Sequence, residues 1–360
     1  MAKARTFVGL DVHATKIVAA VLDAETGELT YFRMNGEIGS AAAFCAGLPR
    51  PVRVAYEAGP TGYGLARELS KRRVGCVVAA PSKIPRASGD RIKTDRRDAE
   101  HLVRLLLAGK LHPVRVPGAE EEALRDLVRA REAVRTDLMR CRHRLSKLLL
   151  RHGIHFDDGK AWTQRHRDWL ATVSLQWPAA QTTLSDVQGA IDALCHRREQ
   201  LEREIVQTLP GSPWEVQAGR LRCLRGVDTL TAVGLCAEVG DFERFGRAEQ
   251  LMSYVGLVPW ENTTGEQRRL GQITKTGSRH ARRLLVEAAW HYRKQPAIGT
   301  KLKDRQAGQP AEVTAIAWSA QRRLHHTWTR LEQRAKRRVI IAVAAARELA
   351  GFCWAICQVE

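Results

Sequence analysis

The sequence predicts a mixed α/β domain followed by a mostly helical remainder. Strand-like and helix-like segments alternate over roughly the first ninety residues, two heptad-patterned segments follow, and the last third has helical periodicity interrupted by glycines. The chain has 360 residues, 44% of them hydrophobic, which is enough for two or three packed domains. We expect an α/β domain over residues 1–115, a helical spacer over 116–210 and a compact helical domain over 211–360.

The first domain should begin with three antiparallel strands. "TFVGLDV" and "KIVAAVLD" are rich in β-forming residues, and the turn "AETGE" at residues 24–28 precedes a third strand, "LTYFRM". "AAAFCAGL" then predicts a helix, "VRVAYEA" a strand, "GLARELSKRR" a helix and "VGCVVAA" a strand. Three antiparallel strands, a helix and further strands form the element order of an RNase H-like domain.

Two segments of the spacer carry sustained heptads. Their seam positions are Leu124, Leu127, Arg131, Val134, Leu138, Cys141, Leu145 and Leu148, then Leu184, Val187, Ile191, Leu194, Arg198, Leu201 and Ile205. Such patterns predict a coiled coil that joins chains or a helical hairpin within one chain, and the sequence leaves both open. The arginine in each seam could fix register at some cost in stability.

The last region begins near Pro213, and its sequence pattern predicts a helix, a turn and a second helix. "LRCLRGVDTLTAVGLCAEVGDFERF" resembles a helix-hairpin-helix, with Gly226 and Gly234 near the turn. Such a turn commonly holds a phosphate, but its glycines also permit close helix packing. The helical tail, residues 311–357, ends in an apolar run that we expect to pack on the core.

The charge of the chain points to a polyanionic partner. The formal net charge is +19 and the pI is about 10.1, so nucleic acid or an anionic membrane surface would be attracted. No apolar run reaches about 18 residues and the first residues predict a strand rather than a signal peptide, so we expect no membrane role. The eight cysteines have no zinc-like spacing and are expected to be reduced thiols of a cytoplasmic protein.

Four carboxylates are candidates for a metal site. Asp11 and Glu57 end apolar strands, and Asp95 and Asp98 lie three apart at a helix start that Thr94 would cap. Capping alone could explain the last two. Together, however, the four would require cations, and hard oxygen ligands select Mg²⁺ or Mn²⁺, which could clamp a phosphodiester under attack. His13, Lys16 and His101 flank them and could touch substrate.

The segment "ENTTGEQRRLGQITKTGSRHARRLLVEAAW" combines a hydroxyl loop with a basic helix. Thr263 and Thr264 precede Gly265, and the segment is dense in cations that could bind nucleic acid: Arg268, Arg269, Lys275, Arg279, Arg282 and Arg283. The last three share one helix ridge, and arginine suits phosphate through bidentate hydrogen bonds. The alternative is an ordinary solvated charged face.

Four stretches resemble the DEDD transposases of bacterial insertion sequences, the group described as bridge-RNA-guided recombinases. They are "GLDVH", "YEAG", "KTDRRDAEHLVRLL" and the block from "LMSYVGLVPW" to "EAAWHYR". The resemblance implies a RuvC-like first domain, a coiled-coil spacer, a transposase domain, and a homo-oligomer, dimer or tetramer, on donor and target DNA. It also implies a structured noncoding guide RNA and a cytoplasmic, nucleoid-associated bacterial protein.

The resemblance assigns roles to individual residues. Asp11, Glu57, Asp95 and Asp98 match its four metal-binding acids. Thr263 matches a serine that attacks the DNA phosphate and becomes covalently linked to it, with Thr264 beside it. A threonine hydroxyl can be a nucleophile, although its methyl group crowds the approach. An impaired copy, or attack by Ser253 or Ser278, stays open.

Other functions compete with a recombinase. A RuvC-type endonuclease would use the same acids and metal without a covalent intermediate. A sugar-kinase or actin-like ATPase is disfavoured because "HATK" replaces the glycine-rich phosphate turn. A non-catalytic nucleic-acid-binding scaffold would leave the acids without a role.

Overall fold

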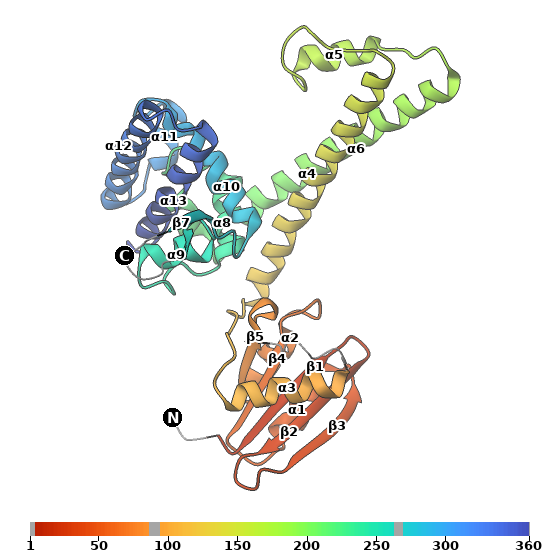
Figure 1. Cartoon of the computed structure of the whole chain (residues 1–360), viewed down its shortest axis with the longest axis vertical. Helices are drawn as coiled ribbons and strands as arrows, with labels where there is room; N and C mark the ends of the chain where they lie inside the picture. The colour runs from red at the N-terminus through yellow and green to blue at the C-terminus, as the bar shows by residue number, and fades with distance from the viewer. Residues whose placement is uncertain (1–3, 86–93, 263–268, 360) are drawn as a thin grey trace. The chain divides into compact units, whose positions relative to one another are not determined.

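The computed structural model describes residues 4–85, 94–262 and 269–359. The chain divides into two compact units, Met1–Gly118 and Ala119–Glu360, which are considered separately (Figure 1). The first is a mixed α/β unit and the second is mostly helical, as the sequence predicts.

The first unit is built on one five-stranded sheet of order β3-β2-β1-β4-β5. The central strand β1 pairs antiparallel with β2 and parallel with β4, and β3 and β5 lie at the edges. The predicted antiparallel start and the later strands are confirmed. The strands are β1 (Thr6–Val12), β2 (Lys16–Asp23), β3 (Leu29–Asn35), β4 (Val52–Glu57) and β5 (Gly75–Ala79).

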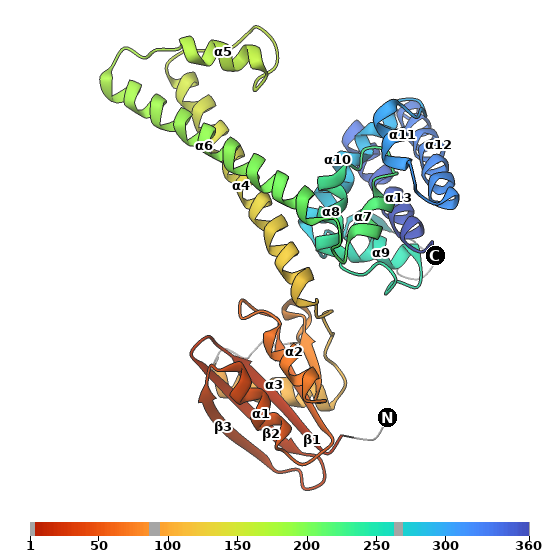
Figure 2. The same ribbon diagram turned by 180° about the vertical axis from the view of Figure 1, so that it is seen from behind.

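Helices cover both faces of this sheet (Figures 1 and 2). On one face, α1 (Ile38–Ala46) and α2 (Gly64–Lys71) share a core with alternate strand residues such as Val8, Leu10 and Val54. On the other, α3 (Asp95–Leu107) packs on Phe7 and Ala55. The strands are apolar on both faces because both are covered.

Helix α3 crosses β1 unusually closely at Gly9. A Cβ atom there would lie 2.1 Å from the backbone oxygen of Ala99 and 2.6 Å from the nitrogen of Val103. Only glycine permits this approach, because the obstructing atoms are backbone and cannot rotate away. Gly9 and Asp11 share one strand face, so the packing at Gly9 also fixes where the start of α3 lies relative to Asp11.

The second unit begins with a helical hairpin. Helices α4 (Ala119–Arg151) and α6 (Pro178–Thr208) pack on each other within one chain, with α5 (Gln164–Thr172) near the far end (Figure 2). Of the two alternatives left open by the heptads, the structure therefore contains the intramolecular hairpin. Both seam arginines lie close to the same acid, Glu202. Arg131 donates a hydrogen bond to Glu202 at 2.9 Å, and Arg198 lies 3.6 Å from it.

The near ends of α4 and α6 join the core of a compact helical bundle. Leu124, Val128, Ile205 and Leu209 belong to the same cluster as the helices that follow. The remaining elements are α7 (Glu215–Leu221), α8 (Thr229–Val239), α9 (Ala248–Tyr254), β6 (Pro259–Glu261), β7 (Leu270–Ile273), α10 (Arg279–Ala289), α11 (Thr300–Gln306), α12 (Ala311–Gln333) and α13 (Arg338–Cys357), besides short 3-10 turns at Pro81–Lys83 and Trp290–Arg293.

The predicted helix-hairpin-helix glycines serve close packing. A Cβ on Gly226 would lie 2.5 Å from the oxygen of Ala288, and one on Gly234 would lie 2.7 Å from the Leu284 side chain. Both therefore pack against α10. Of the two roles that the sequence allowed for these glycines, phosphate binding and close helix packing, the structure thus shows the packing role.

The apolar tail packs into the core, as predicted. Helix α13 is long and apolar enough to span a membrane, but half of that stretch is buried inside the unit, and it contacts α9, α10 and α12. All eight cysteines are free thiols, most of them buried, in agreement with the sequence.

Replacing Gly9 by alanine should destabilise the first unit by about 1–3 kcal/mol, because the new methyl must displace the backbone of α3. Urea unfolding followed by circular dichroism measures the change. Gly39→Ala in α1 is the matched control, since its Cβ would meet only the Glu37 carboxylate at 3.7 Å. Equal midpoints for the two variants would contradict this packing argument.

Candidate functional site

Asp11 and Glu57 lie at the carboxyl ends of adjacent parallel strands. Leu10 of β1 is opposite Tyr56 of β4, so the next positions in register are Asp11 and Glu57. Both follow Gly9 and Ala55 by two residues and thus lie on the α3 face of the sheet. Both side chains are half-buried. The predicted strand-end carboxylates are therefore neighbours in register at one edge of the domain.

Helix α3 brings two more acids to this edge. Thr94 caps the helix by accepting a hydrogen bond from the Arg97 backbone nitrogen at 3.3 Å, as predicted. Asp95 and Asp98 occupy the first turn, Asp95 one turn before Ala99 and Asp98 directly before it, and Ala99 rests on Gly9. The helix dipole favours carboxylates there, but it does not explain why they face Asp11.

Three side chains form a compact group that could hold a metal ion. Ligand atoms of Asp11, His13 and Asp95 all lie within 4.8 Å of one another. The His13 Nε2 atom is 3.2 Å from Asp11 Oδ2 and 3.7 Å from Asp95 Oδ1, and the Lys16 ammonium pairs with Asp95. His13 was expected only as a flanking residue. Its position two residues after Asp11, directly past the end of β1, is the signal that places it here.

The electrostatics of the group favour a cation. Burial raises the pKa of Asp11 above its usual value of 3.8; His13 opposes this, and the charges of Asp95 and Asp98 raise the pKa further. The hydrogen bond from Lys16 lowers the pKa of Asp95. Asp11 is thus a carboxylate whose ionised form is costly unless positive charge is added. Glu57 and Asp98 lie outside the 4.8 Å group, although Asp98 is near enough to influence Asp11.

The predicted hydroxyl segment belongs to the second unit, where it falls between strands β6 and β7 in the sequence. Strands β6 and β7 pair antiparallel, and the Asn262 nitrogen donates to the Arg269 oxygen at 3.0 Å. The Trp260 ring packs over Gly271, where a Cβ would lie 1.9 Å from the ring. Thr263, Thr264 and Arg268 lie in the connecting segment 263–268, outside the described residues.

The predicted basic ridge of α10 divides into internal and exposed cations. The Arg282 guanidinium is half-buried and donates to the backbone oxygens of Val255 and Thr276, so it supports the base of the hairpin. Burial, followed by the charge of Arg279, lowers its pKa. Arg269, Lys275 and Arg279 are exposed.

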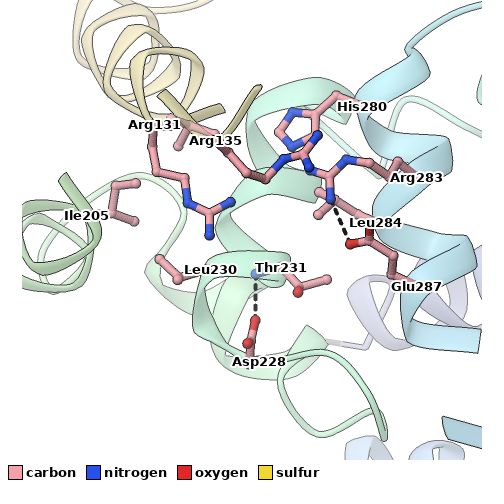
Figure 3. A pocket seen from close by; sticks show the side chains of 11 residues that line it. Arg131, Arg135, Ile205, Asp228, Leu230, Thr231, His280, Arg283, Leu284 and Glu287 are labelled. Carbon is pink, nitrogen blue, oxygen red and sulfur yellow. Dashed lines mark hydrogen bonds and ion pairs between the residues drawn. The ribbon is translucent and has the colours of Figure 1, made fainter. Parts of the chain in front are cut away.

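Arg283 and His280 of α10 line a pocket together with Arg131 and Arg135 of α4 (Figure 3). Arg283 also belongs to a network that joins α10 to the helical hairpin. It donates to Glu132 of α4 and to Glu287, both at 2.7 Å. His280 lies 3.5 Å from Glu132 and 3.7 Å from Glu238. Acids from distant segments thus partly neutralise the local excess of basic residues. The sequence of this helix alone could not reveal these partners.

Glu238 is the most strongly shifted acid of this network. Burial would raise its pKa, but hydrogen bonds with His280 and Ser278 and the charge of Arg129 lower it to about 2. Ser278 donates to Glu238 at 2.7 Å and accepts from the Ala281 nitrogen as the N-cap of α10. Ser278, an alternative nucleophile in the sequence, is therefore engaged in capping, whereas Ser253 is exposed on α9.

Comparison with known proteins decides the family. A model for DEDD transposases of the IS110 type matches residues 8–154, and one described as "Transposase IS116/IS110/IS902 family" matches residues 218–303. Protein y4qE of Sinorhizobium fredii, whose name is that of a transposase, is 41% identical over 98% of this chain and 88% of its own length. The chain belongs to the IS110 family of insertion-sequence transposases.

Other relatives support the assignment. The transposase for insertion sequence element IS1533 of Leptospira borgpetersenii is 34% identical over 93% of this chain and 99% of its own length. The transposase for element IS1328 of Yersinia enterocolitica is 27% identical over 85% of this chain. This transposase is therefore an enzyme that acts on DNA, and the acids of its first unit lie inside a matched region.

Divalent cations should stabilise the first unit through Asp11. Because its pKa is raised in the folded state, ionisation of Asp11 costs stability as the pH rises above 3.8, and a bound cation offsets this cost. At about 100 times its Kd, Mg²⁺ would contribute about 2.7 kcal/mol. Hydrogen exchange of β1 and α3 should slow in Mg²⁺ relative to EDTA.

In EDTA at neutral pH, the amides of β1 and α3 should exchange more slowly in Asp11→Asn than in the wild type. The variant should also lose most of the slowing that Mg²⁺ causes in the wild type. Glu28→Gln, at an exposed acid of the same unit, should keep the response. Identical Mg²⁺ effects in the Asp11 and Glu28 variants would show that Asp11 holds no cation.

Glu238→Gln should destabilise the second unit at neutral pH by about 1–3 kcal/mol, because it removes one charge of a buried, paired network. The pKa of Glu238 is lower in the folded state, so its contribution is present above the unfolded-state pKa and is lost as the pH falls toward 2. Tryptophan fluorescence in urea reports on this unit, since all nine tryptophans lie beyond residue 118. A difference between variant and wild type that stays constant down to pH 2 would contradict this assignment.

Proposed function

We propose that this transposase cuts and rejoins donor and target DNA strands at a divalent-metal site in its first unit, with a hydroxyl group as nucleophile and a structured noncoding RNA as guide. The site comprises Asp11, Glu57, Asp95 and Asp98. The observation that carries the proposal is the compact group of Asp11, His13 and Asp95, in which the pKa of Asp11 is raised.

The residues present fit Mg²⁺ or Mn²⁺. Carboxylate oxygens are the ligands these ions prefer, and a cation between Asp11 and Asp95 would offset the burial and the lesser repulsion from Asp95 that raise the pKa of Asp11. Glu57 and Asp98, at the same edge, would complete the set through side-chain rotation or water. When bound, the metal would polarise the phosphodiester and stabilise the charge on the attacking and leaving oxygens.

His13 and Lys16 would assist from either side of the carboxylates. His13 can donate from Nε2 to Asp11 and so orient that carboxylate. The Lys16 ammonium holds Asp95 at present and, released from it, could contact a phosphate oxygen. Lys16 thus provides positive charge where a polyanionic substrate would approach.

For the first unit we propose a RuvC-like fold of the RNase H type. The sheet order β3-β2-β1-β4-β5, with acids at the ends of β1 and β4, supports it. We also propose that the protein forms a homodimer or homotetramer in the bacterial cytoplasm and associates with the nucleoid when active. The family resemblance supports this assembly.

For the nucleophile we propose the Thr263 hydroxyl, with Thr264 as its neighbour. In the sequence Thr263 falls between β6 and β7, which pair antiparallel, and the exposed cations Arg269 and Lys275 follow it along the chain. Its methyl group restricts rotation and crowds in-line attack, so a slower reaction than with serine is expected. A RuvC-type endonuclease without a covalent intermediate is the second candidate function, because its chemistry needs only the metal site. A catalytically impaired, nucleic-acid-binding copy is the third.

Two variants of Thr263 separate these functions. Thr263→Val keeps the shape and removes the hydroxyl, so covalent protein–DNA adducts should fall below detection while DNA binding remains. Thr263→Ser keeps the hydroxyl without the methyl, so strand exchange should be retained or faster. Adducts are measured by denaturing gel after incubation with DNA carrying the ends of the element.

The outcomes distinguish the candidates. Cleavage by Thr263→Val without adducts would favour the endonuclease. Adducts in that variant would move the role to Thr264 or another residue. Adducts found only with Thr263→Ser would identify an impaired copy.

The guide RNA requires a separate test. The full chain, expressed together with its element, should co-purify with one discrete noncoding RNA transcribed from that element. Sequencing that RNA should find segments complementary to donor and to target DNA. Recombination that proceeds at full rate after ribonuclease treatment would contradict RNA guidance.

A further inference from the structure

One run of positive charge on the helical hairpin is not interrupted by any acid. From Leu138 to Phe156 the chain contains no acid but five Lys or Arg residues: Arg140, Arg142, Arg144, Lys147 and Arg151. In the sequence, this part of α4 was notable only for its apolar seam. In the structure the seam residues Cys141, Leu145 and Leu148 are buried, and the cations between them are left on the outside.

Three of these cations line a groove. His143, Arg144, Lys147, Leu148 and Arg151 of α4 face Thr183 and Val187 of α6 across a space of about 470 Å³. Arg144, Lys147 and Arg151 are exposed, and their spacings of three and four residues keep them on one side of α4. We call these three cations the groove triad.

The groove triad has no recorded carboxylate partner within the described part of the chain. Arg140, by contrast, pairs with Asp137 at 3.1 Å, and Arg142 lies over the Trp162 ring at 4.6 Å. Asp186 is adjacent to Val187 in the sequence but does not line the groove. Three neighbouring cations without carboxylate partners repel one another, which costs free energy. A bound polyanion would remove that repulsion.

The spacing of the triad fits a DNA strand. A helix rises about 1.5 Å per residue, so the seven steps from Arg144 to Arg151 span about 10 Å. Phosphates follow one another by about 3.4 Å along the axis on each strand of duplex DNA, so four consecutive phosphates cover a similar length. The groove has apolar residues, Leu148 and Val187, and cations on its α4 side, a combination that can hold a phosphate backbone.

We propose that the groove triad binds the phosphate backbone of duplex DNA outside the metal site. Duplex DNA is the occupant because DNA is the substrate of the family to which the chain belongs. A second copy of this groove would bring like charges together. The inference requires only family membership, so it is independent of the proposed metal, nucleophile and guide RNA.

The test measures binding of the full chain to a random-sequence 30-bp duplex in EDTA, where metal chemistry is absent, at a series of KCl concentrations. The variant is Arg144→Gln, Lys147→Gln, Arg151→Gln. If each cation neutralises one phosphate, the slope of log K against log salt should become shallower by about 2 to 3. The matched control, Lys301→Gln, Lys303→Gln, Arg322→Gln, removes three exposed cations from α11 and α12, and its slope should match the wild type.

Three results would overturn the proposal. Equal slopes for variant and control would mean that the groove makes no DNA contact. A change seen only with an RNA hairpin of equal length would assign the groove to RNA. A change in oligomeric mass, with the DNA slope unaltered, would make it an interface between copies. Circular dichroism melts should coincide for all three proteins, because the replaced side chains are exposed.

Discussion

The first unit depends on the contact between α3 and β1 at Gly9. Without a side chain at this position, the backbone of Ala99 lies almost directly on the strand. That contact fixes the distance between the end of β1 and the start of α3, so Asp11 and Asp95 approach each other with His13 beside them. The raised pKa of Asp11 is the electrostatic consequence, because packing on both sides removes water from a site where several acids meet.

Charge in the second unit is organised differently. Acids of α4 and α8 contact α10: Glu132 accepts a hydrogen bond from Arg283, and Glu238 lies beside His280. The first contact holds the helical hairpin against the bundle, while Arg282 supports the base of the β6–β7 hairpin. The strands on either side of the segment with the proposed nucleophile are thus supported by partly buried polar contacts. The cations left for nucleic acid are the exposed ones, including Arg279 and the groove triad of α4.

Local patterns in the sequence predicted the strands, the Thr94 cap and the apolar tail, because each follows from periodicity or capping over a few residues. Contacts between distant segments could not be predicted. Nothing near Arg283 indicates Glu132, which is 151 residues away, and nothing near Gly9 indicates Ala99. Likewise, heptads specify an apolar seam but not whether the partner helix belongs to the same chain.

The central claim is that Asp11 and Asp95 form one cation site. Crystals of the full chain soaked in Mn²⁺, with anomalous scattering recorded, test it most directly. We expect a peak between the carboxylates of Asp11 and Asp95, with the Lys16 ammonium moved away from Asp95. Manganese bound only elsewhere, with the Lys16–Asp95 ion pair intact, would contradict the claim.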